Sequence, residues 1–391
     1  MLRPQHERPL LRQHEHRNES AAMTTIEGHV VLPDQVLPAR VTYDSVIRSI
    51  EPFPAAPRRL ILPGFIDGHV HGGDGADTMD GPDAIRRLSR FHLAHGTTTI
   101  LPTTITRPWD DVMSALRAVA EVRAQGVENG PDIYGAHLEG PFVSPHKLGA
   151  QPPFAVAPEP ALVEEALSTG VVKVVTLAPE LDHAEDAIGR FSRAGVRVSL
   201  GHTTTDYEGA ARAICTICAA GGVPGATHMF NAMSPIEGRR PGPVTALICS
   251  DAAYGEMIFD THHVHPATFR LVERNMPGRL LFVTDAMRGA GGPEGESTLG
   301  GQAVMIRDGV VRLPDGSLAG SVLTLDVAFR NAVTTGGMSL PRAAALVSGN
   351  AARYLGLHDR GRIAPGLRAD FVVMDEDFAV QETHVRGMRT T

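Results

Sequence analysis

Two histidines one residue apart, His69 and His71, follow an apolar stretch that ends in a Pro-Gly pair. On a β-strand, residues i and i+2 point to the same face, so both imidazoles can reach one divalent cation. Imidazole nitrogens are borderline ligands that suit zinc or iron. Paired histidines are also common on protein surfaces, so the meaning of this pair depends on the rest of the chain.

Further ligand-type side chains follow other apolar stretches, each where an expected strand ends. In chain order, the residues that follow these stretches are His69 with His71, Glu139, His202, His228, Asp260 with His263, and Asp285. A single polar strand end needs no function. Six in succession indicate that the strands converge on one site, as they do at the C-terminal face of a β/α barrel.

The elements that must position these residues alternate along the middle of the chain. Helices are expected at residues 82–95, 109–125, 159–169, 183–194 and 207–220, and strands at 97–101, 133–138, 171–177, 196–200, 226–228 and 280–284. This alternation predicts an α/β fold, a (β/α)8 TIM barrel.

Both ends of the chain have a different character, with short β-segments broken by prolines. We expect residues 23–62 and 361–391 to form a small β-sandwich domain and residues 63–360 to form the barrel. Residues 1–22 are crowded with Arg, His and Glu and contain no apolar segment. They are expected to be a disordered tail or the product of a misassigned start.

The chemistry of this residue set is that of a mono- or binuclear metal hydrolase. Glu139 is the candidate bridging ligand, because a carboxylate can bind two cations whereas an imidazole cannot. Asp285 is the candidate general base, since an ionised carboxylate can take a proton from water and return it to a leaving group.

Composition narrows the class of protein. The formal net charge of −8 argues against non-specific nucleic-acid binding, although an anionic substrate needs only a local basic pocket. Three cysteines cannot form a disulfide framework, which favours the cytoplasm. Cys215 and Cys218 are expected to pack inside a buried helix. No run of residues is long and apolar enough to span a bilayer.

Six motifs resemble those of the N-acetylglucosamine-6-phosphate deacetylases of the amidohydrolase superfamily. They are PGFIDGHVHGG, LEGPF, LGHTTTD, THMFNAMSP, VTDAM and SLAGSVLTLD, and the resemblance runs from about residue 23 to residue 385. It implies a (β/α)8 barrel beside a small β-sandwich built from both chain ends. The implied activity is metal-dependent deacetylation of N-acetylglucosamine 6-phosphate to glucosamine 6-phosphate and acetate, in amino-sugar catabolism.

The resemblance also assigns roles to individual residues. It implies that Glu139, His202 and His228 are metal ligands and that Asp285 is the catalytic acid/base. His69 and His71 match the members that have capacity for a second metal. The implied substrate contacts are Ala150, Asn231, Ala232, Arg239, His263, Leu318, Ala319 and Gly320. Arg239 suits a phosphate, because guanidinium binds phosphate oxygens in a bidentate manner.

Two residues depart from the family pattern. Gln151 stands where a histidine is usual, and Thr261 replaces a glycine. Both changes concern the substrate pocket, and N-acetylgalactosamine 6-phosphate therefore stays an alternative substrate. We expect one or two divalent metals per chain, zinc before iron, manganese or cobalt. We also expect a cytoplasmic homodimer without nucleic-acid or membrane partners.

Two other functions are open to a chain of this kind. Dihydroorotase-like and N-acyl-amino-acid amidohydrolases often use a carboxylated bridging lysine. Here Lys147 lies in an expected loop and Lys173 lies inside an expected strand, which weighs against that class. An inactive barrel that serves protein association would be expected to have lost metal ligands or the proton shuttle, and neither is lost.

Overall fold

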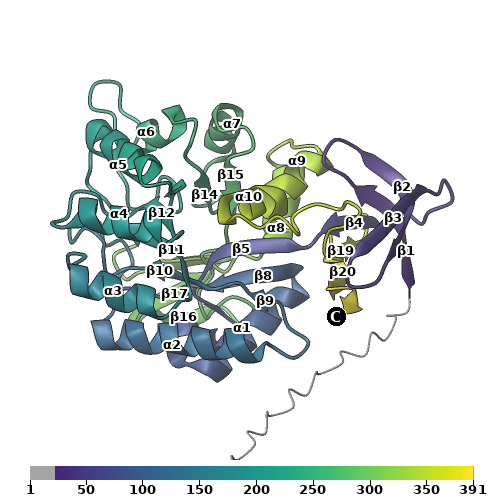
Figure 1. Cartoon of the computed structure of the whole chain (residues 1–391), viewed down its shortest axis with the longest axis horizontal. Helices are drawn as coiled ribbons and strands as arrows, with labels where there is room; N and C mark the ends of the chain where they lie inside the picture. Colours follow the sequence, from purple (N-terminus) through teal and green to yellow (C-terminus); the bar gives the residue numbers. More distant parts are fainter. Residues whose placement is uncertain (1–22, 391) are drawn as a thin grey trace, which may run out of the picture.

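The computed structural model describes residues 23–390, and the tail expected at residues 1–22 lies outside them. A seven-stranded sheet gathers strands from both ends, in the order β21-β20-β19-β4-β1-β2-β3 (Figure 1). Its strands are β1 (Thr24–Val31), β2 (Val36–Tyr43), β3 (Ile47–Pro52), β4 (Leu60–Pro63), β19 (Phe371–Met374), β20 (Val380–Val385) and β21 (Met388–Arg389). β4 pairs with β1 on one side and with β19 on the other, so it joins the two ends of the chain. The domain boundaries expected at residues 62 and 361 stay a prediction.

Between β4 and β19 the chain forms a (β/α)8 barrel. The barrel strands are β5 (Phe65–Val70), β8 (Thr97–Pro102), β9 (Asp132–Ile133) with β10 (Ala136–Glu139), β11 (Val172–Leu177), β12 (Arg197–Leu200), β13 (Pro224–Ala226), β14 (Gly255–Met257) and β15 (Leu280–Phe282). After β5 come a short hairpin, β6 (Gly72–Gly73) and β7 (Ala76–Asp77), and a 3₁₀ turn, η1 (Thr78–Asp80). Neighbouring barrel strands pair in parallel wherever they are hydrogen-bonded.

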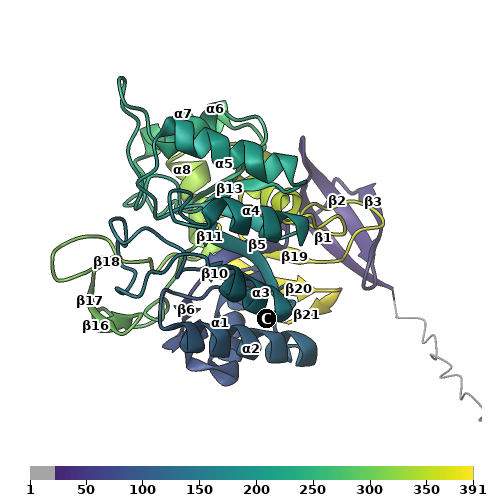
Figure 2. The same ribbon diagram turned by 60° about the vertical axis from the view of Figure 1, so that its left-hand side comes forward.

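Helices cover the outside of these strands (Figure 2). They are α1 (Pro82–Ala94), α2 (Trp109–Gln125), α3 (Pro160–Ser168), α4 (Ala184–Arg193), α5 (Tyr207–Ala219), α6 (Pro243–Cys249), α7 (Pro266–Asn275), α8 (Leu325–Thr334), α9 (Leu340–Ala344), the π-helical turn η2 (Ala345–Gly349) and α10 (Asn350–Leu355). In α2, Val112, Leu116 and Val119 are buried at helical spacing and form the face that packs on the core. Gly126, at φ 76°, ends this helix in a conformation that glycine adopts easily.

One expected strand is divided in two. The residues expected as a single strand at 133–138 form β9, which pairs with β8, and β10, which pairs with β11. Gly135 lies at the break, where an added Cβ would stand 2.4 Å from the carbonyl oxygen of Val171. Only glycine permits this close approach of two backbones. The polar strand end Glu139 is thereby carried by a short strand of its own.

The barrel closes between its first and last strands through Asp67. The buried carboxylate of Asp67 on β5 accepts hydrogen bonds from the Thr284 hydroxyl at 2.7 Å and from the backbone N–H of His69 at 3.2 Å. The backbone N–H of Asp285 donates to the carbonyl of His69 at 2.9 Å. These bonds fix the ends of β5 and β15 against each other, next to the candidate metal ligand His69 and the candidate general base Asp285.

A small antiparallel sheet, which the sequence analysis did not predict, follows β15. It consists of β16 (Gly295–Leu299), β17 (Gln302–Arg307) and β18 (Val310–Arg312). Figure 2 places it at the opposite end of the molecule from β1, β2 and β3. Its inner side chains, Leu299 and Ile306 among them, form a separate apolar cluster with Met287 and Ala319.

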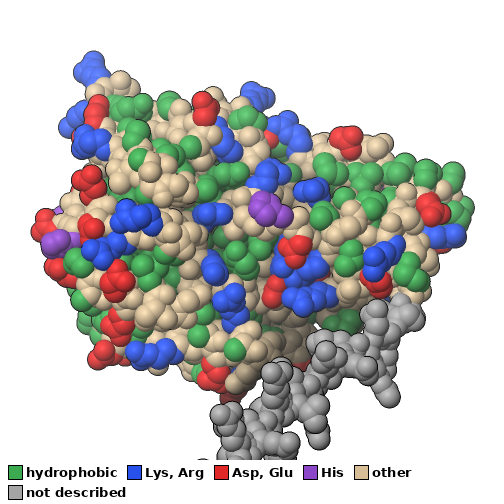
Figure 3. Space-filling view, viewed as in Figure 1, with side chains coloured by type: hydrophobic (Ala, Val, Ile, Leu, Met, Phe, Trp, Pro, Cys, Tyr) green, Lys and Arg blue, Asp and Glu red, His purple; other side chains and the backbone are tan. Residues whose placement is uncertain are grey.

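The cysteines correct another expectation. Cys215 and Cys218 are exposed free thiols on α5, because Ala213, Ile214 and Ile217 form the buried face of that helix. The outer surface carries interspersed basic, acidic and apolar side chains on the face shown in Figure 3. Within residues 23–390, no helix has the length and apolar character needed to cross a bilayer.

Candidate active site

Glu139, His202 and His228 meet at the C-terminal ends of β10, β12 and β13. The Nε2 atoms of His202 and His228 lie 3.3 and 3.1 Å from Oε1 of Glu139 and 3.1 Å from each other. All three side chains are buried. Two imidazole nitrogens that face each other and the same carboxylate oxygen at these distances are placed as ligands of one shared cation would be.

This arrangement fits a divalent metal ion. Ligand atoms at about 2.0–2.1 Å around a tetrahedral zinc stand roughly 3.3 Å apart, which is the spacing found here. The donor set, two imidazoles and a carboxylate, is one that zinc, iron, manganese and cobalt accept. The three residues predicted as metal ligands are thus brought together as one coordinating group.

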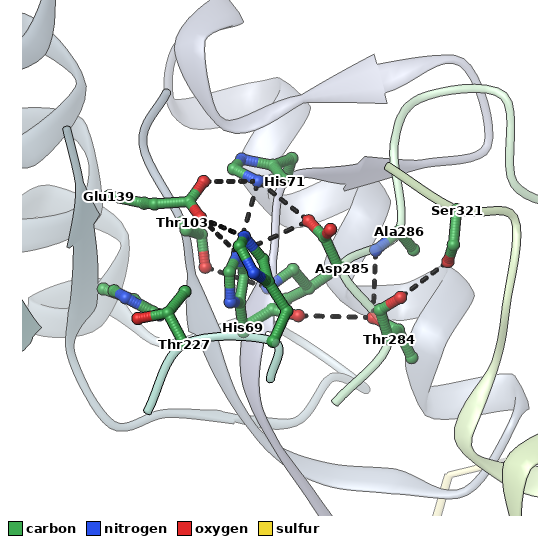
Figure 4. A network of polar contacts seen from close by, with 12 residues as sticks. His69, His71, Thr103, Glu139, Thr227, Thr284, Asp285, Ala286 and Ser321 are labelled. Atoms are coloured by element: carbon green, nitrogen blue, oxygen red, sulfur yellow. Dashed lines mark hydrogen bonds and ion pairs between the residues drawn. The ribbon is translucent and has the colours of Figure 1, made fainter. Parts of the chain in front are cut away.

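A second coordinating group, His69, His71 and Asp285, lies beside Glu139 (Figure 4). Nε2 of His71 is 3.1 Å from Oδ1 of Asp285, and Nε2 of His69 is 3.4 Å from the same oxygen and from Nε2 of His71. Glu139 faces both groups, because its Oε2 is 3.1 Å from His71 while its Oε1 faces His202 and His228. The position of Glu139 is therefore that of a carboxylate able to bridge two cations.

The backbone is strained at three of these strand ends. His202, His228 and Asp285 have φ values of 47°, 29° and 47°, in the left-handed region that non-glycine residues rarely adopt. Such conformations cost of order 1–3 kcal/mol each and concentrate at functional sites. At each position the chain leaves the strand abruptly and turns the side chain into the barrel mouth.

Two contacts hold the first group in place. Nε2 of Gln151 donates to Oε2 of Glu139 at 2.6 Å, and Oε1 of Gln151 accepts from the backbone N–H of Thr106 at 2.7 Å. Nδ1 of His202 lies 2.9 Å from the carbonyl oxygen of Lys147, which directs Nε2 of this ring at Glu139. The departure from the family pattern at Gln151 thus contacts the predicted metal ligand Glu139 directly.

The electrostatics keep both carboxylates ionised. Burial would raise the pKa of Asp285, but His69 and His71 outweigh burial and lower it to about 2. For the same reason the imidazoles around Glu139, His69 foremost, hold the pKa of Glu139 well below its usual range. Burial would lower the pKa of His71, but Asp285 and Glu139 raise it to about 9. Each pKa moves in the direction expected of anions and cations that stabilise one another.

A pocket of about 290 Å³ opens above the two groups. Six of the predicted substrate contacts line it: Ala150, Asn231, Ala232, His263, Leu318 and Gly320. Ala319 is buried behind the wall, and Arg239 lies on an exposed loop outside the lining residues. Leu299 of β16 and Ser317 complete one side of the pocket, so the small sheet forms part of its wall. The catalytic and binding roles of all these residues stay predictions.

His263 is oriented by Asp260. Its Nδ1 donates to Oδ2 of Asp260 at 2.7 Å, which leaves Nε2 to face the pocket. Thr261, the second departure from the family pattern, has φ 73°, the left-handed region that favours glycine. The loop therefore keeps the conformation of a glycine-containing turn without the glycine.

Sequence reasoning missed three features of this site. Asp67 lies inside the motif that carries the histidine pair, so its position could have drawn attention to it. Glu256 was missed because none of the expected strands covers β14 (Gly255–Met257), the strand on which it lies. Gln151 was recognised only as a departure, since no sequence pattern places a loop residue against Glu139.

A buried cluster of histidines and carboxylates at the C-terminal mouth of a (β/α)8 barrel, below a pocket, defines a metal-dependent hydrolase. Comparison with known proteins identifies the family of hydrolases to which the chain belongs. The amidohydrolase family model matches residues 60–276, and a second amidohydrolase family model matches residues 319–391.

Curated relatives cover most of the chain. The N-acetylgalactosamine-6-phosphate deacetylase of Escherichia coli O157:H7 is 37% identical over 88% of this chain and 92% of its own length. The N-acetylglucosamine-6-phosphate deacetylase of Vibrio furnissii is 36% identical over 87% of this chain and 85% of its own length.

A solved structure agrees over nearly the whole fold. A variant of the N-acetyl-D-glucosamine-6-phosphate deacetylase of Mycobacterium smegmatis, in complex with N-acetyl-D-glucosamine-6-phosphate, has a TM-score of 0.88 and 32% identity, and the match covers 95% of this chain and 100% of that one. The chain belongs to the amidohydrolase family, among the N-acetylglucosamine-6-phosphate deacetylases.

Proposed function

We propose that this chain hydrolyses the acetamide bond of N-acetylglucosamine 6-phosphate and releases acetate and glucosamine 6-phosphate, as a step of amino-sugar catabolism. The observation that carries this proposal is the pair of coordinating groups with Asp285 at the floor of a pocket of about 290 Å³. The relatives supply the substrate, because deacetylases of amino-sugar 6-phosphates match most of the chain.

The residues divide the work of hydrolysis. Glu139, His202 and His228 would hold one divalent cation, and His69, His71 and Asp285 a second, with Glu139 between them. A cation bound there lowers the pKa of water and polarises an acyl oxygen. Asp285 accepts a proton from the attacking water and delivers it to the amine nitrogen as the C–N bond breaks. His263 and Asn231 orient the sugar at the pocket wall.

The nature of the metal belongs to the same proposal. We infer zinc, since imidazole and carboxylate ligands at this spacing suit it, with iron, manganese and cobalt as the alternatives. We also propose that the enzyme works as a cytoplasmic homodimer. Elemental analysis and light scattering of the purified protein test these two points.

Recognition of the phosphate is assigned to Arg239. This residue is exposed and lies outside the residues that line the pocket, so it would have to approach when substrate binds. A guanidinium group binds phosphate oxygens in a bidentate manner, and its long side chain gives it reach. Arg240 beside it pairs with Glu237 at 3.9 Å, which makes Arg239 the better candidate.

N-acetylgalactosamine 6-phosphate is the second candidate substrate. The deacetylase of that sugar phosphate from Escherichia coli O157:H7 is a relative at 37% identity. The two sugars differ only in the orientation of the C4 hydroxyl, so the same catalytic groups would serve both.

The experiment measures acetate release from four compounds by the metal-loaded enzyme. These are the 6-phosphates of N-acetylglucosamine and N-acetylgalactosamine and the two unphosphorylated sugars. We expect N-acetylglucosamine 6-phosphate to have the highest kcat/KM of the four compounds. Arg239→Ala should raise KM for the phosphorylated sugars, because a remote phosphate contact contributes uniform binding. Arg240→Ala is the matched control. Absence of acetate release from N-acetylglucosamine 6-phosphate would overturn the proposal. An equal penalty of Arg239→Ala on all four compounds would overturn the role of Arg239.

A further inference from the structure

Glu256 is an unexpected charge inside the barrel. It lies on β14, its side chain is 1% exposed, and its Oε1 has no hydrogen-bond partner. Its Oε2 lies 3.0 Å from Nδ1 of His69 and 3.4 Å from the backbone N–H of His228. A buried carboxylate is costly unless it is paired, so its position calls for a reason in the neighbouring site.

The contact with Glu256 decides which nitrogen of His69 is available. A carboxylate at Nδ1 accepts the N–H of a neutral imidazole and leaves the lone pair on Nε2. Nε2 of His69 is the atom that faces Oε1 of Glu139 and Oδ1 of Asp285, each at 3.4 Å. By contrast, Nδ1 of His71 has no such partner within the described residues.

A different role for Glu256, as a ligand of a separate ion with His69 and His137, does not fit. These three residues lie close enough together to be considered. Both nitrogens of His137 are already engaged, Nδ1 with the carbonyl of Gly68 at 3.1 Å and Nε2 with the hydroxyl of Thr176 at 2.8 Å. His137 therefore has no lone pair to offer, and Glu256 serves His69 instead.

We propose that Glu256 is a positioning residue that sets the tautomer and the ring orientation of His69 and thereby builds the second cation position of His69, His71 and Asp285. The inference rests on the metal dependence of the proposed function. It makes the second cation position an integral part of the site, because the buried carboxylate of Glu256 has His69 as its side-chain partner and, beyond that, a longer contact with the backbone N–H of His228.

The test is a titration of the full-length metal-free protein with Co²⁺. Binding is monitored by calorimetry and by the visible absorption spectrum. The wild type should bind two Co²⁺ ions. Glu256→Gln keeps the size of the side chain and removes its charge, and it should weaken the second ion about 10–100-fold while the first is unchanged. Glu273→Gln is the matched control, since Glu273 is another buried glutamate but pairs with Arg342.

Three results would overturn the inference. They are a wild type that binds one ion, a Glu256→Gln variant whose two affinities equal those of the wild type, and a variant that loses both ions equally. His69→Ala provides a further check, because adding Glu256→Gln to it should change no affinity if Glu256 acts through His69. None of these readouts uses a sugar, so a failure of the proposed substrate is distinguishable from a failure of this inference.

Discussion

Asp285 is the residue to which we assign proton transfer, and it also belongs to the second coordinating group. Its carboxylate contacts both histidines of the pair, and its backbone N–H is bonded to the carbonyl of His69. A change at this position can therefore act on the chemistry, on the second cation, or on both. The first coordinating group, built on Glu139, contains no atom of Asp285.

Asp285→Asn keeps the size of the side chain but removes the proton acceptor. We expect kcat to fall by roughly two to four orders of magnitude, the scale of general acid–base catalysis. The ion held by Glu139, His202 and His228 should remain. Initial rates and elemental analysis of the same preparation check both statements. A variant with wild-type kcat would contradict the assignment of Asp285.

Thr261 offers a prediction about stability. A β-branched residue at φ 73° is strained, and glycine would adopt this conformation freely. We expect Thr261→Gly to raise the free energy of unfolding by about 1 kcal/mol after the entropy cost of glycine is counted.

Thr335→Gly is the control, because Thr335 has φ −103° and gains nothing from glycine. It should lower stability by about 0.5–1 kcal/mol. Denaturant titrations of the two variants would show opposite shifts, and equal shifts would mean that the loop carries no strain.

At the scale of elements, the small sheet β16–β18 forms part of one wall of the pocket through Leu299. Ile306 packs under it, whereas its neighbour Met305 is 40% exposed on the other face. Ile306→Ala should loosen this sheet locally, since its apolar cluster is separate from the main core. A loss of about 2 kcal/mol would accelerate amide exchange in β16–β18 roughly 30-fold.

We expect KM for the sugar phosphate to rise in the Ile306→Ala variant and kcat to change little, because the catalytic groups lie on other strands. Met305→Ala should leave both exchange and KM unchanged. Protection in β16–β18 that survives Ile306→Ala would show that the sheet is held by something other than this cluster.

Much of the element order can be predicted from the sequence. The helix expected at residues 109–125 has the same bounds as α2, because its apolar spacing is regular and Pro108 and Gly126 mark its ends. The division into β9 and β10 cannot be read in the same way, since an apolar run does not show that Gly135 must admit a neighbouring carbonyl. The sheet β16–β18 escaped prediction because it lies outside the β/α alternation and faces a cluster of its own.

The residues of the site likewise divide into those that can be predicted from the sequence and those that cannot. Residues that end strands, such as Glu139 and His202, are predictable because a barrel brings all strand ends to one mouth. Glu256 is not, since one acidic residue within an apolar segment gives no periodic signal. The contact between Gln151 and Glu139 depends on how a loop folds back, which no local pattern encodes.

At the scale of the whole molecule, Asp132 ties the barrel to the C-terminal segment. It lies on β9 and accepts from Nη1 of Arg360 at 2.5 Å and from Nη1 of Arg368 at 2.7 Å. Both arginines are buried. Burial alone would raise the pKa of Asp132, but the two guanidinium groups hold it below its usual value.

Asp132→Asn should lower stability by up to about 3 kcal/mol, because it leaves buried guanidinium charge less compensated. Since the pKa of Asp132 is lower in the folded state, its contribution is complete above the unfolded pKa of about 3.9 and is lost as pH falls below it. Unfolding curves of wild type and variant should therefore converge in acid. Asp83→Asn is the control, because the Asp83 side chain that pairs with Arg86 is fully exposed and its replacement should change little. Curves that stay parallel down to acid pH would contradict this account.

The position of β4 between β1 and β19 has a consequence for synthesis of the chain on the ribosome. β4 ends at Pro63 and β19 begins at Phe371, so at roughly 5–20 residues per second a ribosome needs about 15–60 s between them. Throughout that interval the edge of β4 that β19 will cover presents unpaired N–H and C=O groups, which a strand of another nascent chain can occupy. The step most exposed to aggregation is thus not the assembly of the barrel. It is the period during which β4 remains unpaired on one edge until β19 has been synthesised.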